Sequence, residues 1–158
     1  MNVRPIARAL LGGIFIIGGW DLLQKPKPKV PAAEDVGVPI AKKMGLPTDP
    51  MELIKINGMV QFVGGILLAL GWMPRLASLA LAASLVPTTL SAHRFWEISD
   101  PEQRKMQMMH AFKNGSILGG LVMSALDHGG RPSLFWMTGK AADRVEDAVS
   151  SALDRVTS

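Results

Sequence analysis

Six polar side chains stand within, or at the edges of, otherwise apolar stretches of this sequence. They are Asp21, Asn57, His93, His110, Lys113 and Asn114. An ionisable or amide group at membrane depth is costly unless it pairs, forms hydrogen bonds or lines a cavity, so these side chains are candidates for a ligand site or a structural polar cluster. The chain shows no nucleophile–base pair, catalytic carboxylate dyad or nucleotide-binding loop. We therefore predict no catalytic residue.

Three interpretations of this cluster remain open. Asp21 and Lys113 could form a buried ion pair that fixes the register of the helices. The cluster could instead line a pocket for an amphipathic ligand such as a quinone or a lipid, or a path for protons or solutes. A soft metal on His110 and its neighbouring methionines is not favoured, because methionines near a membrane interface are expected to pack. We predict no metal and no cofactor, with quinone as the ligand of the second interpretation.

The helices that position these side chains are predicted from the stretches of sequence that carry no charge. Residues 56–74 and 76–92 carry no charge, and each stretch is long enough to cross most of a ~30 Å hydrocarbon core at ~1.5 Å per residue. A soluble chain of 158 residues could not bury two such helices. A shorter apolar run precedes them, and a run interrupted by ionisable residues follows. We predict an all-α integral membrane four-helix bundle with spans at about 5–24, 51–73, 75–96 and 104–127.

Local signals set the boundaries of these helices. Asp49-Pro50 and Asp100-Pro101 each offer an N-cap aspartate followed by proline at the first helical position. In the loop at 25–49, prolines alternate with lysines at first, which favours an extended, polyproline II conformation there. We predict a transmembrane domain at 1–137 that includes this loop. The apolar positions of residues 138–158 recur at helical spacing, which predicts an amphipathic surface helix as a separate tail.

Glycines are predicted to form the packing surfaces between the helices. In lipid, close approach over small residues is what holds a bundle together. The expected packing positions are Gly12, Gly13, Gly64, Gly65, Gly115 and Gly119. If the helices alternate in direction, both termini lie on one side of the membrane and all six polar residues gather near the opposite face.

Charge and composition narrow the function classes. The net charge of +4 is spread over loops and mixed with acids, so we predict no nucleic-acid binding and expect the loop lysines to meet lipid headgroups. The chain contains no cysteine, which excludes disulfides, thiolate metal sites and thiol catalysis. The loop side carries more Lys and Arg than the side of the termini, which by itself favours termini outside the cytoplasm.

Several short motifs carry a resemblance to a known family. They are RALLGGIF at 8–15 followed by the Pro-Lys loop, VPIA at 38–41 with GLP at 45–47, HRFW at 93–96, and FKN at 112–114 followed by the glycine pair at 119–120. With these motifs, residues 4 to 127 resemble the DoxX family of small four-helix membrane proteins, especially its actinobacterial members. The tail lies outside the resemblance.

The resemblance implies a function that the residues alone do not. Members of the DoxX family are linked to thiosulfate:quinone oxidoreduction and to membrane-associated redox complexes. We therefore expect an accessory subunit that scaffolds or anchors a redox or cell-envelope complex, with lipids and other membrane or peripheral proteins as partners. A quinone-linked oxidoreductase subunit, with its pocket at Asp21, His93 and Lys113, is the alternative, and a lipid or small-solute carrier is the third. The resemblance also implies a multi-pass protein of the bacterial plasma membrane with cytoplasmic termini, which we follow over the charge count.

Overall fold

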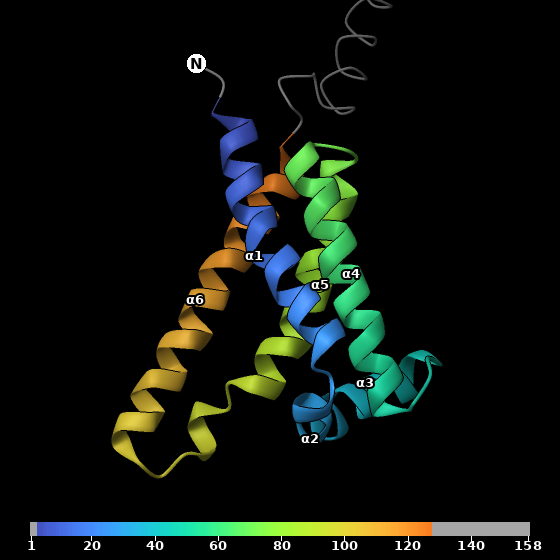
Figure 1. Ribbon diagram of the computed structural model, residues 1–158. Helices are drawn as coiled ribbons and strands as arrows, with labels where there is room; N and C mark the ends of the chain where they lie inside the picture. Colours follow the sequence, from blue (N-terminus) through green and yellow to red (C-terminus); the bar gives the residue numbers. More distant parts are fainter. Residues whose placement is uncertain (1–2, 128–158) are drawn as a thin grey trace, which may run out of the picture. The chain divides into compact units, whose positions relative to one another are not determined.

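The computed structural model describes residues 3–127, and these form helices and connecting turns with no strand among them (Figure 1). The long helices are α1 (Arg4–Gln24), α4 (Pro50–Leu70), α5 (Pro74–Ala92) and α6 (Pro101–Leu126). Each predicted span thus forms a helix close to its expected bounds. The predicted tail helix at 138–158 and the last part of the predicted 1–137 domain lie outside the described residues.

Among the described residues, three helices are long and apolar enough to cross a membrane. They are Arg4–Gln24, Pro50–Leu70 and Pro74–Glu97, the last of which includes the short 3₁₀ helix η3 (Phe95–Glu97). Helix α6 is not one of the three, because the charged and polar side chains of its first half lower its hydropathy. The all-helical fold is therefore confirmed for the described residues, with three candidate membrane spans, and the fourth span stays a prediction.

The aspartate caps form at both predicted helix starts. The carboxylate of Asp49 accepts hydrogen bonds from the backbone amides of Met51 and Glu52, at 3.2 and 3.3 Å. The carboxylate of Asp100 accepts one from the amide of Gln103 at 3.0 Å. These amides have no partner inside the helix, so the caps fix where α4 and α6 begin.

Helices α1 and α4 run antiparallel and touch through glycine. A Cβ atom added at Gly12 would lie 2.5 Å from the carbonyl oxygen of Gly65, and one added at Gly19 would lie 2.7 Å from that of Gly58. On each helix the two glycines are seven residues apart, so they share one face at a spacing of two turns. No side chain fits between the backbones at these points, and glycine is what permits the close approach.

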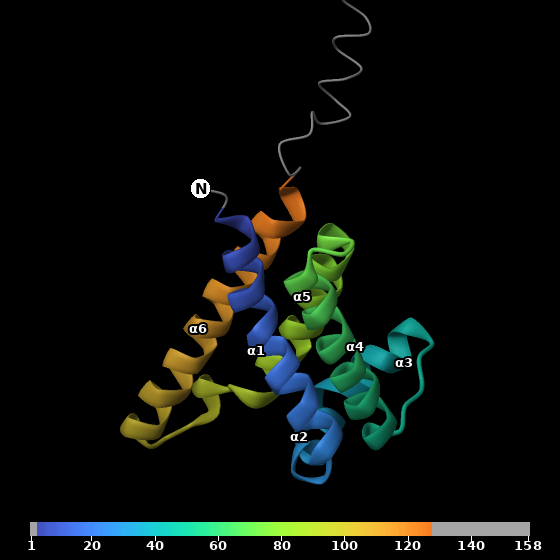
Figure 2. The same ribbon diagram turned by 45° about the horizontal axis from the view of Figure 1, so that its top comes forward.

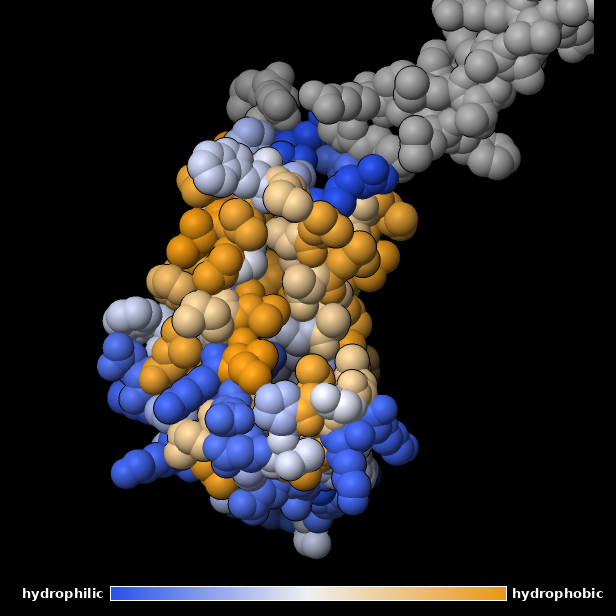
Figure 3. Space-filling model, turned by 90° about the vertical axis from the view of Figure 1, so that its right-hand side faces the viewer, coloured by the Kyte–Doolittle hydropathy of each residue, from blue (hydrophilic) through white to orange (hydrophobic). Residues whose placement is uncertain are grey.

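Helix α5 connects the α1–α4 pair to α6. It follows α4 through a tight turn in which Gly71 and Met73 both adopt positive φ, at 74° and 48°. Its buried side chains join those of the three other long helices in one small apolar core, made of Phe15, Leu68, Ala77, Leu81, Leu85 and Leu121. Many other large apolar side chains of these helices remain exposed. Figure 3 shows them as an apolar band with hydrophilic residues below it, as expected for helices that face lipid.

The segment between α1 and α4 is helical, which corrects the extended conformation predicted for its Lys-Pro start. It contains η1 (Lys27–Lys29), α2 (Val30–Ala32), the π-helical turn η2 (Ala33–Gly37) and α3 (Val38–Met44). Proline fixes φ near −65°, a value that 3₁₀ and α helices share with polyproline II. Pro28, Pro31 and Pro39 each lie at the first or second position of their helix, where the missing N–H costs little. Figure 2 shows α2 and α3 folded at the end of α1 and beside the start of α4.

Candidate functional site

The alternating helix directions bring the predicted polar residues into one half of the bundle. The last turns of α1 and α5 and the first turns of α4 and α6 lie at the same end (Figure 1). Asn57, His93, His110 and Asn114 lie partly buried in this half. Asp21 and Lys113 are exposed. The predicted set thus divides into an interhelical group and two outward-facing charges.

Two histidines and two amides line the contact between α5 and α6. The rings of His93 and His110 stack with centroids 5.3 Å apart and planes 20° from parallel. His93 Nδ1 lies 2.6 Å from Gln107 Oε1. An amide oxygen only accepts, so the His93 ring donates from Nδ1, and its Nε2 is then the nitrogen left with a lone pair in the neutral ring. One turn deeper, Asn114 Nδ2 donates to Thr89 Oγ1 at 3.1 Å.

A second polar group joins α4 to α5, and most of it was missed from the sequence. Ser84 Oγ donates to Asn57 Oδ1 at 2.6 Å and accepts from Gln61 Nε2 at 3.1 Å. Thr88 Oγ1 accepts from Asn57 Nδ2 at 3.1 Å and donates to the carbonyl of Ser84 at 2.7 Å. Gln61 and Ser84 are only 5% and 7% exposed. Their signal was present in the sequence, because Asn57 and Gln61, like Ser84 and Thr88, stand four residues apart and share a helix face.

The charged pair Asp21 and Lys113 does not meet. Asp21 lies nine residues after Gly12, half a turn out of phase with it, so it points away from the α4 side of α1. Helix α6 approaches α1 near Gly120 and Leu11, and towards Pro101 it leans away from α1 (Figures 1 and 2). Among the described residues neither side chain forms an ion pair. The ion-pair interpretation is therefore not realised, and the ligand-binding role stays a prediction.

Of the six predicted packing glycines, three lie against another helix and three do not. Gly12 and Gly65 meet in the α1–α4 seam, and a Cβ at Gly64 would press on the Leu81 side chain of α5 at 3.0 Å. A Cβ at Gly13 would meet no described atom within 4 Å. The same holds at Gly115 and Gly119 on α6. The seam glycine Gly58 was not among the predicted packing positions, although its spacing of seven residues from Gly65 marks it.

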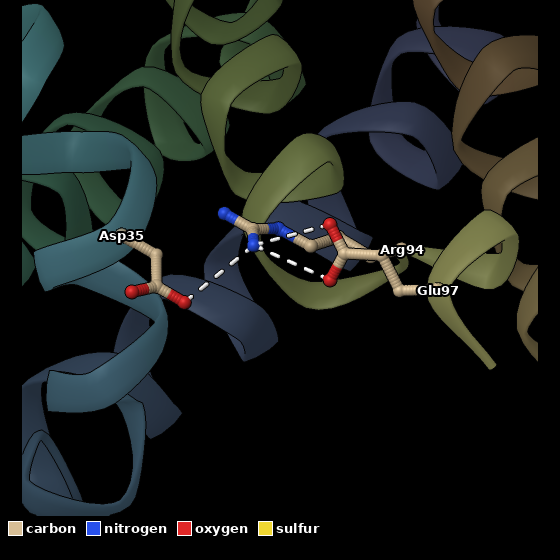
Figure 4. Close-up of polar contacts among 3 residues, drawn as sticks. All are labelled: Asp35, Arg94 and Glu97. Atoms are coloured by element: carbon tan, nitrogen blue, oxygen red, sulfur yellow. Dashed lines mark hydrogen bonds and ion pairs between the residues drawn. The ribbon is translucent and has the colours of Figure 1, made fainter.

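An arginine clamp, defined here as Arg94 with Asp35 and Glu97, ties the segment after α1 to the link between α5 and α6. Arg94 Nη1 lies 3.6 Å from the Asp35 carboxylate and 3.4 Å from that of Glu97 (Figure 4). The two acids are well exposed, so each ion pair contributes at most about 1 kcal/mol. The clamp positions this segment rather than supplying much stability.

The buried polar groups of the described bundle are satisfied by contacts between and within its helices. Among the described residues, no buried side-chain nitrogen or oxygen lacks a hydrogen-bond partner. No group of three or more His, Asp and Glu side chains in this part of the chain is arranged to hold a metal ion. The buried amides and hydroxyls act on one another across helix interfaces. What remains free to meet another molecule is at the surface.

Comparison with known proteins identifies the family. No curated protein and no solved structure gives a significant match to this chain. The family model described as DoxX matches residues 4–94, which span α1 to the end of α5 and exclude α6. That match covers more than half of the 158 residues and agrees with the helices found. This membrane protein belongs to the DoxX family.

Proposed function

We propose that the protein is an accessory membrane subunit that scaffolds or anchors a redox or cell-envelope complex. One observation carries the proposal. Helix α6 contacts α5 on one side, while its opposite side presents Gly115 and Gly119 with no described atom near either. In the α1–α4 seam of the same chain, glycines at regular spacing are where another helix docks. The open glycine face of α6 therefore suits a helix of a partner protein.

The proposal includes a fourth membrane crossing by α6. Ser78 near the start of α5 bonds to Ser124 near the end of α6, at 2.8 Å between hydroxyl oxygens. At the other end His93 bonds to Gln107. Helix α6 thus runs alongside α5 over nearly the whole length of α5, and a helix paired in this way shares the bilayer depth of its partner. We place the chain as a multi-pass protein of the bacterial plasma membrane with cytoplasmic termini.

Single cysteines test the crossing and the orientation, because the native chain has none. Cysteine at Gln103, before the hydrophobic part of α6, is expected to react from outside the cell with a membrane-impermeant maleimide. Cysteine at Asp127, directly after α6, is expected to react only after the cells are opened. Labelling of Gln103→Cys and Asp127→Cys from the same side would contradict the proposed placement.

Purification from native membranes tests the scaffold function. The wild-type protein in mild detergent is expected to bring down stable partners of a redox or envelope complex, identified by mass spectrometry. Gly115→Leu with Gly119→Leu is expected to release them, because leucine blocks close helix approach. Gly13→Leu is the matched control, since Gly13 is also open but lies on α1. A partner-free wild-type protein, or partners kept by the α6 variant, would refute the proposal.

A quinone-linked oxidoreductase subunit is the second candidate, and the stacked histidines favour it. His93 and His110 lie in the same half of the bundle as Lys113, and Lys113 is exposed and has no ion pair among the described residues. Imidazole and ammonium donors at this depth suit the carbonyl oxygens of a quinone. His93→Ala and Lys113→Ala would then abolish quinone-dependent turnover at unchanged expression. Retained turnover, or simple misfolding of both variants, removes this candidate.

A further inference from the structure

Five lysines on the segment between α1 and α4 carry charge that the fold does not use. They are Lys25, Lys27, Lys29, Lys42 and Lys43, and the term lysine surface is used for them here. All five are exposed, and none forms an ion pair with another described residue. The segment is folded into short helices and held by the arginine clamp, so these charges are displayed on a defined surface.

The acids of the same segment are Glu34, Asp35 and Asp49, fewer than its lysines. Asp35 and Glu97 bind Arg94. Asp49 and Asp100 cap α4 and α6. Of the three acids between residues 25 and 49, this leaves Glu34 as the one that no described contact occupies. With five lysines and three acids, residues 25–49 keep a net charge of +2.

Apolar side chains accompany these lysines at the boundary of the bilayer. Ile40, Met44 and Leu46 are exposed, Met44 by 67%, within a few residues of Lys42 and Lys43. The segment connects the end of α1 to the start of α4, and both helices are candidate membrane spans. Residues at the ends of two spans lie at headgroup depth. A surface with free ammonium groups beside exposed apolar side chains matches an amphiphile with an anionic head.

We propose that the lysine surface binds anionic phospholipids, with the ammonium groups on the lipid phosphates and Ile40, Met44 and Leu46 at the acyl boundary. An acidic protein segment would satisfy the lysines but would leave the neighbouring apolar side chains in water. A free phosphate would do the same. The lipid is the ligand that meets both halves of the surface, and basic residues near a membrane surface each gain about 1 kcal/mol from anionic lipid.

The test measures lipid binding to the full-length protein in detergent by native mass spectrometry. Phosphatidylglycerol, phosphatidylcholine and glycerol phosphate are compared as ligands. Lys42→Gln with Lys43→Gln removes two charges from the lysine surface, and Arg104→Gln with Lys105→Gln removes two exposed charges from the start of α6 as the matched control. Phosphatidylglycerol is expected to bind more tightly than phosphatidylcholine. Lys42→Gln with Lys43→Gln is expected to lower the affinity for phosphatidylglycerol about 25-fold at low salt, because each lysine contributes about a factor of five.

The control variant and Lys42→Arg with Lys43→Arg are expected to bind phosphatidylglycerol like the wild type, because the charge of the lysine surface is kept. Circular dichroism checks that each variant is folded. Equal binding of the two phospholipids would overturn the proposal. So would an equal loss of affinity in the two glutamine variants, or glycerol phosphate that binds as tightly as the lipid. A bound acidic protein together with no lipid preference would assign the surface to a protein partner instead.

Discussion

Alanine at Gly12 tests the α1–α4 seam, on which the fold rests. The added Cβ would lie 2.5 Å from the carbonyl oxygen of Gly65 and 3.1 Å from the backbone nitrogen of Ala69. A carbon and a carbonyl oxygen rarely approach closer than about 3.3 Å, so the two helices must separate by about 0.8 Å. The obstacle is backbone rather than a flexible side chain, and it cannot move aside alone.

The cost follows from the weaker packing between the two helices once the seam opens. Overpacking of this kind costs about 1–3 kcal/mol, because a gap of about 0.5–1 Å forfeits a quarter to a half of the dispersion attraction between facing atoms. In the opposite direction, alanine stabilises a helix by about 0.5–1 kcal/mol relative to glycine. We therefore expect Gly12→Ala to lower the free energy of unfolding by roughly 0.5–2 kcal/mol.

The neighbouring glycine supplies the control. Gly13 has the same helical environment, and a Cβ there would meet no described atom within 4 Å. Gly13→Ala should therefore show only the gain in helix propensity, and the difference between the two variants isolates the clash at about 1–3 kcal/mol. Both are measured by reversible unfolding in mixed detergent micelles, followed by circular dichroism. Equal stability of the two alanine variants within about 0.5 kcal/mol would refute the packing argument.

Three further predictions address the polar residues. Thr88→Val is expected to lower the unfolding free energy by about 1 kcal/mol in the same assay, because it removes an interhelical acceptor, whereas Thr88→Ser should retain it; equal losses would contradict the network. In a double-mutant cycle, the losses of unfolding free energy caused by Asp21→Asn and Lys113→Met should be additive within about 0.5 kcal/mol, since the two groups form no ion pair. A coupling energy above about 1 kcal/mol would contradict the separation of Asp21 from Lys113. Arg94→Gln should speed limited proteolysis within residues 25–49 while changing stability by less than about 1 kcal/mol, and unchanged cleavage would rule out the clamp.

The boundary of the family match has a consequence for function. The match ends at residue 94, so α6, with His110, Lys113 and the open glycine face, lies beyond it. Both proposed functions depend on α6: the scaffold on its outer face, and the quinone site on its histidine and lysine. Variants of α6 therefore test both proposed functions without changing the helices that the family model matches.

The sequence alone was sufficient for the four long helices, because the signals that set them are local. Missing charges marked the apolar spans, and Asp49 and Asp100 marked two helix starts through caps made within three residues. Successive spans were expected to alternate in direction, so the end of the bundle that holds the polar residues could be predicted. The conformation of the Lys-Pro start of the segment after α1 was predicted wrongly, because proline permits both an extended and a 3₁₀ conformation.

What only the tertiary structure decided is the rotation of each helix about its own axis and the angle between neighbours. Each residue turns the face of a helix by about 100°, so a small change in phase separates an outward Asp21 from an ion pair with Lys113. The same rotation put Gly19 and Gly58 into the α1–α4 seam and left Gly115 and Gly119 open. It also joined Gln61 to Ser84, a contact between helices that depends on how two side chains meet in space. The order of residues determines how deep a residue lies along its helix. The direction in which its side chain points depends on how all the neighbouring helices pack together.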